Sequence, residues 1–231
     1  MKHNRQAGFT IVEMLIATAV FAVVLLVMSA AIIQIGRFYY KGITSAHTQE
    51  VARSIMENMA QTVQFTSGQI TTDGLEAPTD FQTKAICVGT YHYSYKLGQQ
   101  RTGNLHSLVM YDNHNSCAGR VAQTLNTAVL GQELLGDKMR LSKFTVTQVP
   151  GSTSTYKVTV GVLYGDSGLV CVAGSTSGLA DDCNATGEMT DTQVTSAADN
   201  GTNTLRCKNV RSGSEFCAVS ELSTIVERRV Q

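Results

Sequence analysis

The chain turns from polar to apolar at Gly8-Phe9-Thr10-Ile11-Val12-Glu13. Residues 1–7 form a short basic leader that contains Lys2 and Arg5, and residues 14–36 carry no charge. Glu13 therefore stands at the head of an apolar segment long enough to cross a bilayer. An ionised side chain costs roughly 2.5–3.5 kcal/mol at the centre of a membrane helix on insertion scales, so a carboxylate kept here indicates a specific use.

These residues resemble the prepilin signature of type IV pilins and type II secretion pseudopilins, with a basic leader, Gly-Phe-Thr and a glutamate in order. Within that family a dedicated peptidase cuts after the glycine, here Gly8, and the new N-terminal residue, here Phe9, becomes N-methylated. The resemblance implies that the Glu13 carboxylate meets the Phe9 amine of a neighbouring subunit during assembly. The implied partners are other pilin or pseudopilin subunits, the prepilin peptidase/N-methyltransferase and an inner-membrane assembly platform.

The segment 9–36 is predicted to be a single transmembrane helix that later enters the core of a filament. Its length suffices to span a bilayer, and its alanines allow close approach of neighbouring helices. Because Lys2 and Arg5 precede the segment, the N-terminus is expected to stay in the cytoplasm. The expected localisation is the cytoplasmic membrane, followed by an extracytoplasmic filament that carries the rest of the chain outside.

Composition leaves room for one domain beyond the membrane segment, since the chain has 231 residues. The formal net charge is zero, and loss of Lys2 and Arg5 with the leader would leave 16 basic against 18 acidic residues, or −2. No run of lysine or arginine stands out. The sequence therefore lacks an electrostatic footprint for nucleic-acid binding.

The expected fold class is α+β. Apolar residues recur every four positions at Val51, Ile55, Met59 and Val63, which predicts an amphipathic helix. We expect one long helix from about Thr10 to Gln64, transmembrane in its first half and amphipathic in its second, ended by Ser67-Gly68. Period-two alternation after Phe81 predicts strands at about 86–95, 105–111, 139–149, 156–164 and 216–230. The resemblance implies a pilin-like arrangement, with this helix packed on an antiparallel β-sheet.

Four segments follow from these patterns: a leader at 1–8, a filament-core helix at 9–36, an amphipathic half at 37–66 and an extracytoplasmic β-rich domain at 67–231. Within that domain, residues 174–203 hold almost nothing to bury and are expected to form a long exposed loop. Asp182 and Asn184 begin like an EF-hand calcium loop, but Gln193 stands where a bidentate glutamate is wanted. A solvated acidic loop is favoured, no cofactor is expected, and calcium stays open as the alternative.

All six cysteines follow the apolar segment, and none lies in a Cys-x-x-Cys pair: Cys87, Cys117, Cys171, Cys183, Cys207 and Cys217. An even number on the exported side indicates disulfides formed outside the cytoplasm. The favoured pair is Cys207–Cys217, because a Ser212-Gly213 turn midway would bring the two sulfurs within reach. The remaining local choices are Cys87–Cys117 and Cys171–Cys183, although six cysteines allow 15 pairings.

The sequence favours a structural subunit of a type IV pilus or a type II secretion-like filament, a minor pilin or pseudopilin, acting by assembly and not by catalysis. Residues 134–141 and the two alternating strands after them loosely resemble the larger J/W class of minor pilins and pseudopilins. The alternative is a membrane-anchored exported binding protein or enzyme with a chance prepilin-like N-terminus. Gly165-Asp166-Ser167-Gly168 resembles a protease nucleophile segment but fits a strand-ending turn better.

Overall fold

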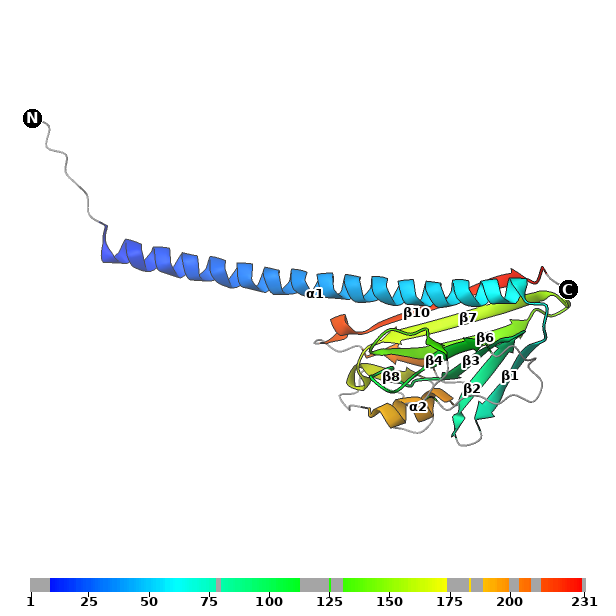
Figure 1. Cartoon of the computed structure of the whole chain (residues 1–231). Coiled ribbons are helices and arrows are strands. Elements are labelled where there is room, and N and C mark those ends of the chain that lie inside the picture. The colour runs from blue at the N-terminus through cyan, green and yellow to red at the C-terminus, as the bar shows by residue number, and fades with distance from the viewer. Residues whose placement is uncertain are drawn as a thin grey trace, which may run out of the picture. The chain divides into compact units, whose positions relative to one another are not determined.

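The computed structural model describes residues 9–77, 80–112, 125, 131–173, 183, 189–199, 204–208 and 213–229. They form one long helix, one short helix and a set of antiparallel strands (Figure 1). The helices are α1 (Ile11–Phe65) and α2 (Asp191–Asp199), and the 3-10 turns are η1 (Ser167–Leu169) and η2 (Ser214–Phe216). The strands are β1 (Ile70–Ala77), β2 (Asp80–Val88), β3 (Tyr91–Lys96), β4 (Leu108–Asp112), β5 (Gln132–Glu133), β6 (Met139–Gln148), β7 (Thr155–Tyr164), β8 (Val170–Ala173), β9 (Thr204–Cys207) and β10 (Ala218–Glu227).

Helix α1 runs unbroken over 55 residues, and it begins and ends one residue later in the chain than predicted. It contains no proline, and its two glycines, Gly36 and Gly42, are tolerated at a modest cost in helix propensity. Its buried side chains lie only in the second half: Thr48, Ala52, Ile55, Met56, Met59 and Val63. Apart from the adjacent Ile55 and Met56, successive positions are three or four residues apart, so they form a single stripe along one face of the helix.

Contacts along the chain separate two compact units, which meet within α1 between Tyr40 and Lys41. The first unit contains the apolar half of the helix, whose large side chains are exposed. The second unit contains the amphipathic half of α1 and every strand. The boundary expected after Gly36 rests on hydropathy, whereas this division rests on packing.

The strands form three antiparallel sheets. A five-stranded sheet has the order β1-β2-β3-β4-β5, a three-stranded sheet has the order β10-β7-β6, and β8 pairs with β9. Strand β10 pairs with β7 in unbroken register from Ala218–Tyr164 to Glu227–Thr155. Bridges from Leu97 to Leu141 and from Gln100 to Arg140 tie the end of β3 to β6. The two larger sheets are thereby joined beneath the amphipathic half of α1.

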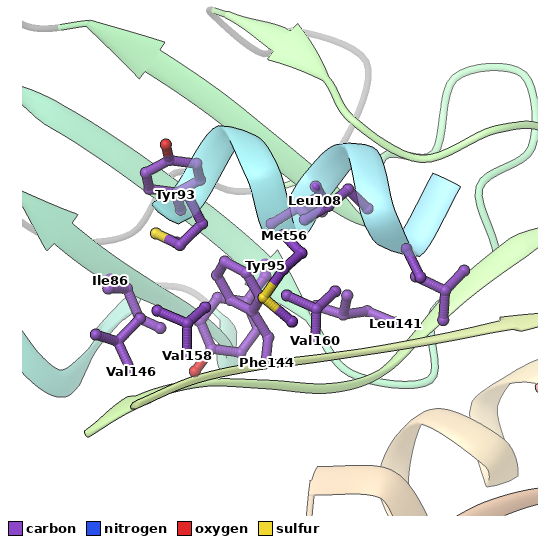
Figure 2. Packing of buried hydrophobic residues seen from close by; sticks show 14 of the residues in the cluster. Met56, Ile86, Tyr93, Tyr95, Leu108, Leu141, Phe144, Val146, Val158 and Val160 are labelled. Atoms are coloured by element: carbon purple, nitrogen blue, oxygen red, sulfur yellow. The ribbon is translucent and has the colours of Figure 1, made fainter. Parts of the chain in front are cut away.

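The main core lies between the buried stripe of α1 and the inner faces of the two larger sheets. Figure 2 shows Met56 of α1 reaching toward Phe144 and Val160 of the three-stranded sheet. Phe144 also meets Tyr95 of β3 edge-on, with ring centroids 5.1 Å apart. Full burial of each such side chain stabilises the fold by about 1.5–3 kcal/mol. The buried stripe of α1 therefore supplies one side of the domain core.

A second, smaller core lies beneath α2. Val194 and Ala198 of α2 are 0% and 3% exposed, and they pack with Val170, Val172 and Leu205 of the β8–β9 pair. The two α2 residues are four positions apart, so they share one helix face. This packing fixes α2 on the two-stranded sheet.

The structure corrects the strand expected at about 86–95, which is two strands joined by a tight turn at Gly89 and Thr90. Gly89 adopts φ +65°, a conformation that favours glycine. Its backbone also crosses Gly68 so closely that a Cβ on Gly68 would lie 2.5 Å from the Gly89 Cα. The alternation shifts by one residue at this turn, from Ile86 and Val88 to Tyr91 and Tyr93, and the sequence prediction overlooked that shift.

The long exposed loop expected at 174–203 is wrong for residues 191–199, which form α2 and bury side chains. Two apolar residues at the correct spacing, Val194 and Ala198, were enough to dock a short helix on an existing apolar surface. Strands β1, β5, β8 and β9 were also missed. Strand β5 has two residues and β8 and β9 have four each, which is too short for a clear alternation, whereas β1 has eight residues but few apolar ones. The fold class itself is confirmed: α+β and pilin-like, with the long N-terminal helix packed on antiparallel sheets.

Candidate functional site

Thr10 and Glu13 form a reciprocal hydrogen-bonded pair at the start of α1. The Thr10 backbone N–H and side-chain hydroxyl donate to Glu13 Oε2 at 2.9 and 3.0 Å. In return, the Glu13 backbone N–H donates to Thr10 Oγ1 at 3.3 Å. This is a Thr-x-x-Glu capping box, in which the residue before the helix and the third helical residue satisfy each other's backbone donors.

The capping box uses only one oxygen of the Glu13 carboxylate. The second oxygen, Oε1, accepts no hydrogen bond from the part of the chain that the structure describes. Glu13 therefore keeps acceptor capacity for a cation while it closes its own helix. An assembly role was the only role expected for Glu13; the capping role was missed, although the Thr-x-x-Glu spacing was a usable signal.

Apolar surface surrounds this carboxylate. Phe9 and Ile11 beside it are 84% and 82% exposed, and the large apolar side chains from Phe9 to Ile43 are all at least 42% exposed. Helix α1 is long and apolar enough to cross a membrane, judged by length and composition. Exposed apolar surface on this scale marks contact with a membrane or with other proteins.

Other sites expected from the sequence fall outside the described residues. These are the cleavage-site glycine Gly8, the weak calcium candidates Asp182 and Asn184, and Cys117. Among the described residues, no group of three or more His, Cys, Asp or Glu side chains is placed to hold a metal ion. Gln193, which occupied the last position of the expected calcium loop, instead caps α2 through its Oε1, which accepts from the Thr190 N–H at 2.9 Å.

Two disulfides lie in the described residues: one is the pair favoured from the sequence, and the other is among the remaining local choices. Cys171 bonds to Cys183 and Cys207 bonds to Cys217, with Cα–Cα distances of 5.4 and 5.7 Å. The reason given for Cys207–Cys217 was wrong, because β9 and β10 belong to different sheets and do not form a hairpin. Cys87 is also disulfide-bonded.

Arg140 is a buried charge that the sequence analysis did not single out. Its side chain is 0% exposed, and Nη2 pairs with Asp191 Oδ1 at 2.6 Å. The other guanidinium nitrogens donate to the carbonyls of Gly98 at 2.9 Å and Gly165 at 3.3 Å. A buried guanidinium requires such partners. Arg140 thus joins the start of α2 to the ends of β3 and β7.

Comparison with known proteins gives one match. Residues 3–29 match the family model described as the prokaryotic N-terminal methylation motif. No curated protein matches the chain, and no solved structure does. The matched residues include the leader, Gly8, Phe9 and Glu13, so the chain carries a prepilin-type N-terminal signal at the head of α1.

Proposed function

We propose that this chain is a structural subunit of a type IV pilus or a type II secretion-like filament. One observation carries the proposal: the N-terminal methylation motif leads directly into a helix that is exposed and apolar in its first half and buried in a β-rich domain in its second. Such a helix can supply a filament core while the domain that it belongs to forms the outer surface. The mechanism is assembly and not catalysis.

Maturation in this proposal begins with the chain in the cytoplasmic membrane, spanning it once with the N-terminus in the cytoplasm. The prepilin peptidase cuts between Gly8 and Phe9 and methylates the Phe9 amine. An inner-membrane assembly platform then draws the processed chain into the filament beside other pilin or pseudopilin subunits. The uncharged run after Glu13 supports the membrane stage, because its large apolar side chains are exposed and it carries no charge to bury in lipid.

Glu13 sets the axial register of the subunit in this proposal by pairing with the Phe9 amine of a neighbour. The free Oε1 supports this role, because the amine can approach without opening the capping box. A buried charge pair adds little net stability, but it is well suited to fixing register, because a shift in register would leave a buried charge without its partner.

Within the family, we favour a minor pilin or pseudopilin, loosely of the J/W class. The support is the antiparallel pair of ten-residue strands β6 and β7, the first of which begins within residues 134–141. The corresponding division of the chain is a leader at 1–8, a filament-core helix at 9–36, an amphipathic half at 37–66 and an extracytoplasmic domain at 67–231.

Intact-mass measurement tests the proposal. Full-length protein produced together with a prepilin peptidase should lose residues 1–8 and gain one methyl group on Phe9, whereas Gly8→Leu protein should keep the leader. Recovery of the uncut wild-type chain under these conditions would contradict the assignment. It would favour the second class, a membrane-anchored exported protein whose N-terminus resembles a prepilin by chance.

A further inference from the structure

A cleft of about 630 Å³ opens between the last two turns of α1 and the β2–β3 turn. This volume lies within the range of about 300–1,000 Å³ that small-molecule sites occupy. The side chains that matter for its chemistry come from α1, the turn after it and the start of β3: Asn58, Gln61, Phe65, Ser67, Thr90 and Tyr91. All of them belong to the compact unit that begins at Lys41.

The frame of this cleft is fixed by backbone contacts. Gly68 and Gly89 line the cleft where their backbones cross closely, and the Gly89 N–H donates to the Gln69 carbonyl at 2.9 Å. Arg228 donates to the carbonyls of Thr66 and Gly68, which holds the segment after α1 in place. The cleft is therefore a preformed feature of the fold, which lowers the entropic cost of binding a ligand.

The polar groups of the cleft are available to a ligand. Asn58 Oδ1 accepts from the Tyr93 hydroxyl at 2.9 Å, which orients the amide, while its Nδ2 has no acceptor within the described chain. The side chains of Gln61, Ser67 and Thr90 likewise make no hydrogen bond to described residues. The cleft thus offers amide and hydroxyl groups in both donor and acceptor roles.

Two aromatic rings border these polar groups. Phe65 is 60% exposed and Tyr91 is 36% exposed, although large apolar side chains of the same unit are mostly buried. None of the residues that line the cleft carries a charge at neutral pH. Neutral hydrogen-bonding groups beside exposed aromatic faces match a ligand that has hydroxyl groups on its edges and C–H groups on its faces.

We propose that this cleft binds a neutral saccharide of one or two rings. The sugar hydroxyls bond to Asn58, Gln61 and Thr90, and the C–H face of a ring packs on Tyr91 or Phe65. A phosphate or metal-dependent ligand is disfavoured because the cleft has no cation or carboxylate to meet it. The inference goes beyond assembly, because the site lies outside the apolar half of α1 and requires no filament.

Saturation-transfer NMR on the full chain in zwitterionic detergent micelles tests this proposal, with N,N′-diacetylchitobiose, lactose and maltose as probes at up to about 20 mM. We expect transfer from the aromatic protons to at least one sugar. Tyr91→Ala or Phe65→Ala should weaken that binding roughly tenfold, consistent with the loss of one aromatic contact. Glucose 6-phosphate should bind no more tightly than the uncharged sugars, because the lining residues of the cleft offer no cation to its phosphate.

Two matched variants separate binding from folding. Asn58→Asp keeps the oxygen that accepts from Tyr93 but removes the amide donors, so it should weaken sugar binding while the near-UV spectrum is retained. Phe216→Ala removes an exposed ring outside the cleft and should leave binding unchanged. Absence of transfer to all three sugars, or equal binding by folded Tyr91→Ala and Phe65→Ala proteins, would overturn the proposal. Reduced filament incorporation of those two variants without sugar binding would instead assign the cleft to a neighbouring protein subunit.

Discussion

At the scale of single residues, Glu13 has two separable properties. One carboxylate oxygen closes the α1 N-terminus with Thr10, while the second accepts nothing from the described residues. The capping box requires only a hydrogen-bond acceptor at this position, and glutamine serves as well as glutamate. Register pairing with an amine requires the negative charge. Amide and carboxylate variants therefore distinguish the two roles.

The first prediction is that Glu13→Gln protein will be inserted in the membrane normally but will enter filaments at least tenfold less than wild type. If Glu13 pairs with the Phe9 amine of a neighbour as proposed, loss of the charge would leave that amine without its partner in a low-dielectric core, which is strongly unfavourable. Quantitative immunoblots of sheared filaments and of membranes measure the ratio. Thr10→Ala is the matched control, since it costs about 1 kcal/mol of local helix stability but keeps the charge. Equal incorporation of wild type and Glu13→Gln would exclude the register role.

Tyr93 provides a second prediction, because it is a titratable group that is 0% exposed in the core. Burial raises the pKa of Tyr93 to about 12, the hydrogen bond with Thr62 opposes that rise, and the nearby Tyr91 adds to it. The unfolded chain releases this proton near pH 10. Between pH 10 and 12 the folded chain holds more protons than the unfolded chain, so the free energy of unfolding falls as the pH rises.

The stabilisation from this shift is complete below pH 10, and roughly 2–3 kcal/mol of it is lost by pH 12, at about 1.4 kcal/mol for each pKa unit. Denaturant unfolding of wild type and Tyr93→Phe at pH 8 and pH 11.5 checks this expectation. At pH 8 the variant should be less stable by about 1 kcal/mol, because the hydrogen bond to Asn58 is lost. At pH 11.5 the difference should vanish or reverse. A difference that does not change with pH would show that Tyr93 titrates normally.

At the scale of elements, both helices begin with the same device. Thr10 and Glu13 cap α1, and Thr190 and Gln193 cap α2 with reciprocal hydrogen bonds. For α2 the cap is followed by a charged pair between Asp191 and the buried Arg140. Close packing adds to this, since a Cβ on Gly98 would lie 2.9 Å from the Cβ of Ala198. Helix α2 is thus held by its cap, its charge and its apolar face together.

The third prediction concerns this apolar face. Val194→Ala should lower the free energy of unfolding by about 2 kcal/mol, because it leaves a cavity between α2 and the β8–β9 pair. Thr192→Ala changes an exposed position of the same helix and should alter stability by about 0.5 kcal/mol or less. Thermal melting followed by near-UV circular dichroism compares the two variants. Equal melting temperatures would show that α2 does not belong to the core.

Local periodicity explains which elements the sequence predicted. Helix α1 and strand β7 were anticipated to within one residue, because apolar residues repeat over many turns in one and alternate over ten residues in the other. Helix α2 was missed because only Val194 and Ala198 mark its inner face, although the Thr190–Gln193 spacing is a capping signal for its start. The Cys207–Cys217 pair was anticipated for the wrong reason, since the partners of β9 and β10 are set by contacts distant in sequence.

The same limit applies to the candidate site. Gly8, Phe9 and Glu13 are recognisable because their order and spacing are local, and the motif match covers them. Their roles in cleavage, methylation and assembly stay predictions. The cleft beside Phe65 and Tyr91 was not foreseeable, because it forms only where the end of α1 meets a turn between two strands. Residues that come from distant segments of the chain form no local motif, so a site built from them cannot be recognised by spacing in the sequence.

At the scale of the whole molecule, α1 belongs to two compact units, one that exposes its apolar side chains and one that buries them. Up to Tyr40 its large apolar side chains are exposed, and beyond Lys41 its inner stripe is buried. The second unit contains both apolar clusters, both described disulfides and all of the sheets. It therefore has everything that a domain needs to fold by itself.

The last prediction follows from this division. A fragment of residues 41–231 should be soluble without detergent and should unfold in one cooperative transition, because it keeps the whole buried stripe of α1. A fragment of residues 67–231 lacks Ala52, Ile55, Met59 and Val63, and loss of these contacts is comparable to the whole stability of about 5–15 kcal/mol that a domain possesses. The shorter fragment should aggregate or show no near-UV signal. If the 41–231 fragment failed to fold, the apolar half of α1 would be required for folding of the domain. If the 67–231 fragment folded, the amphipathic half of α1 would pack on a core that is stable without it.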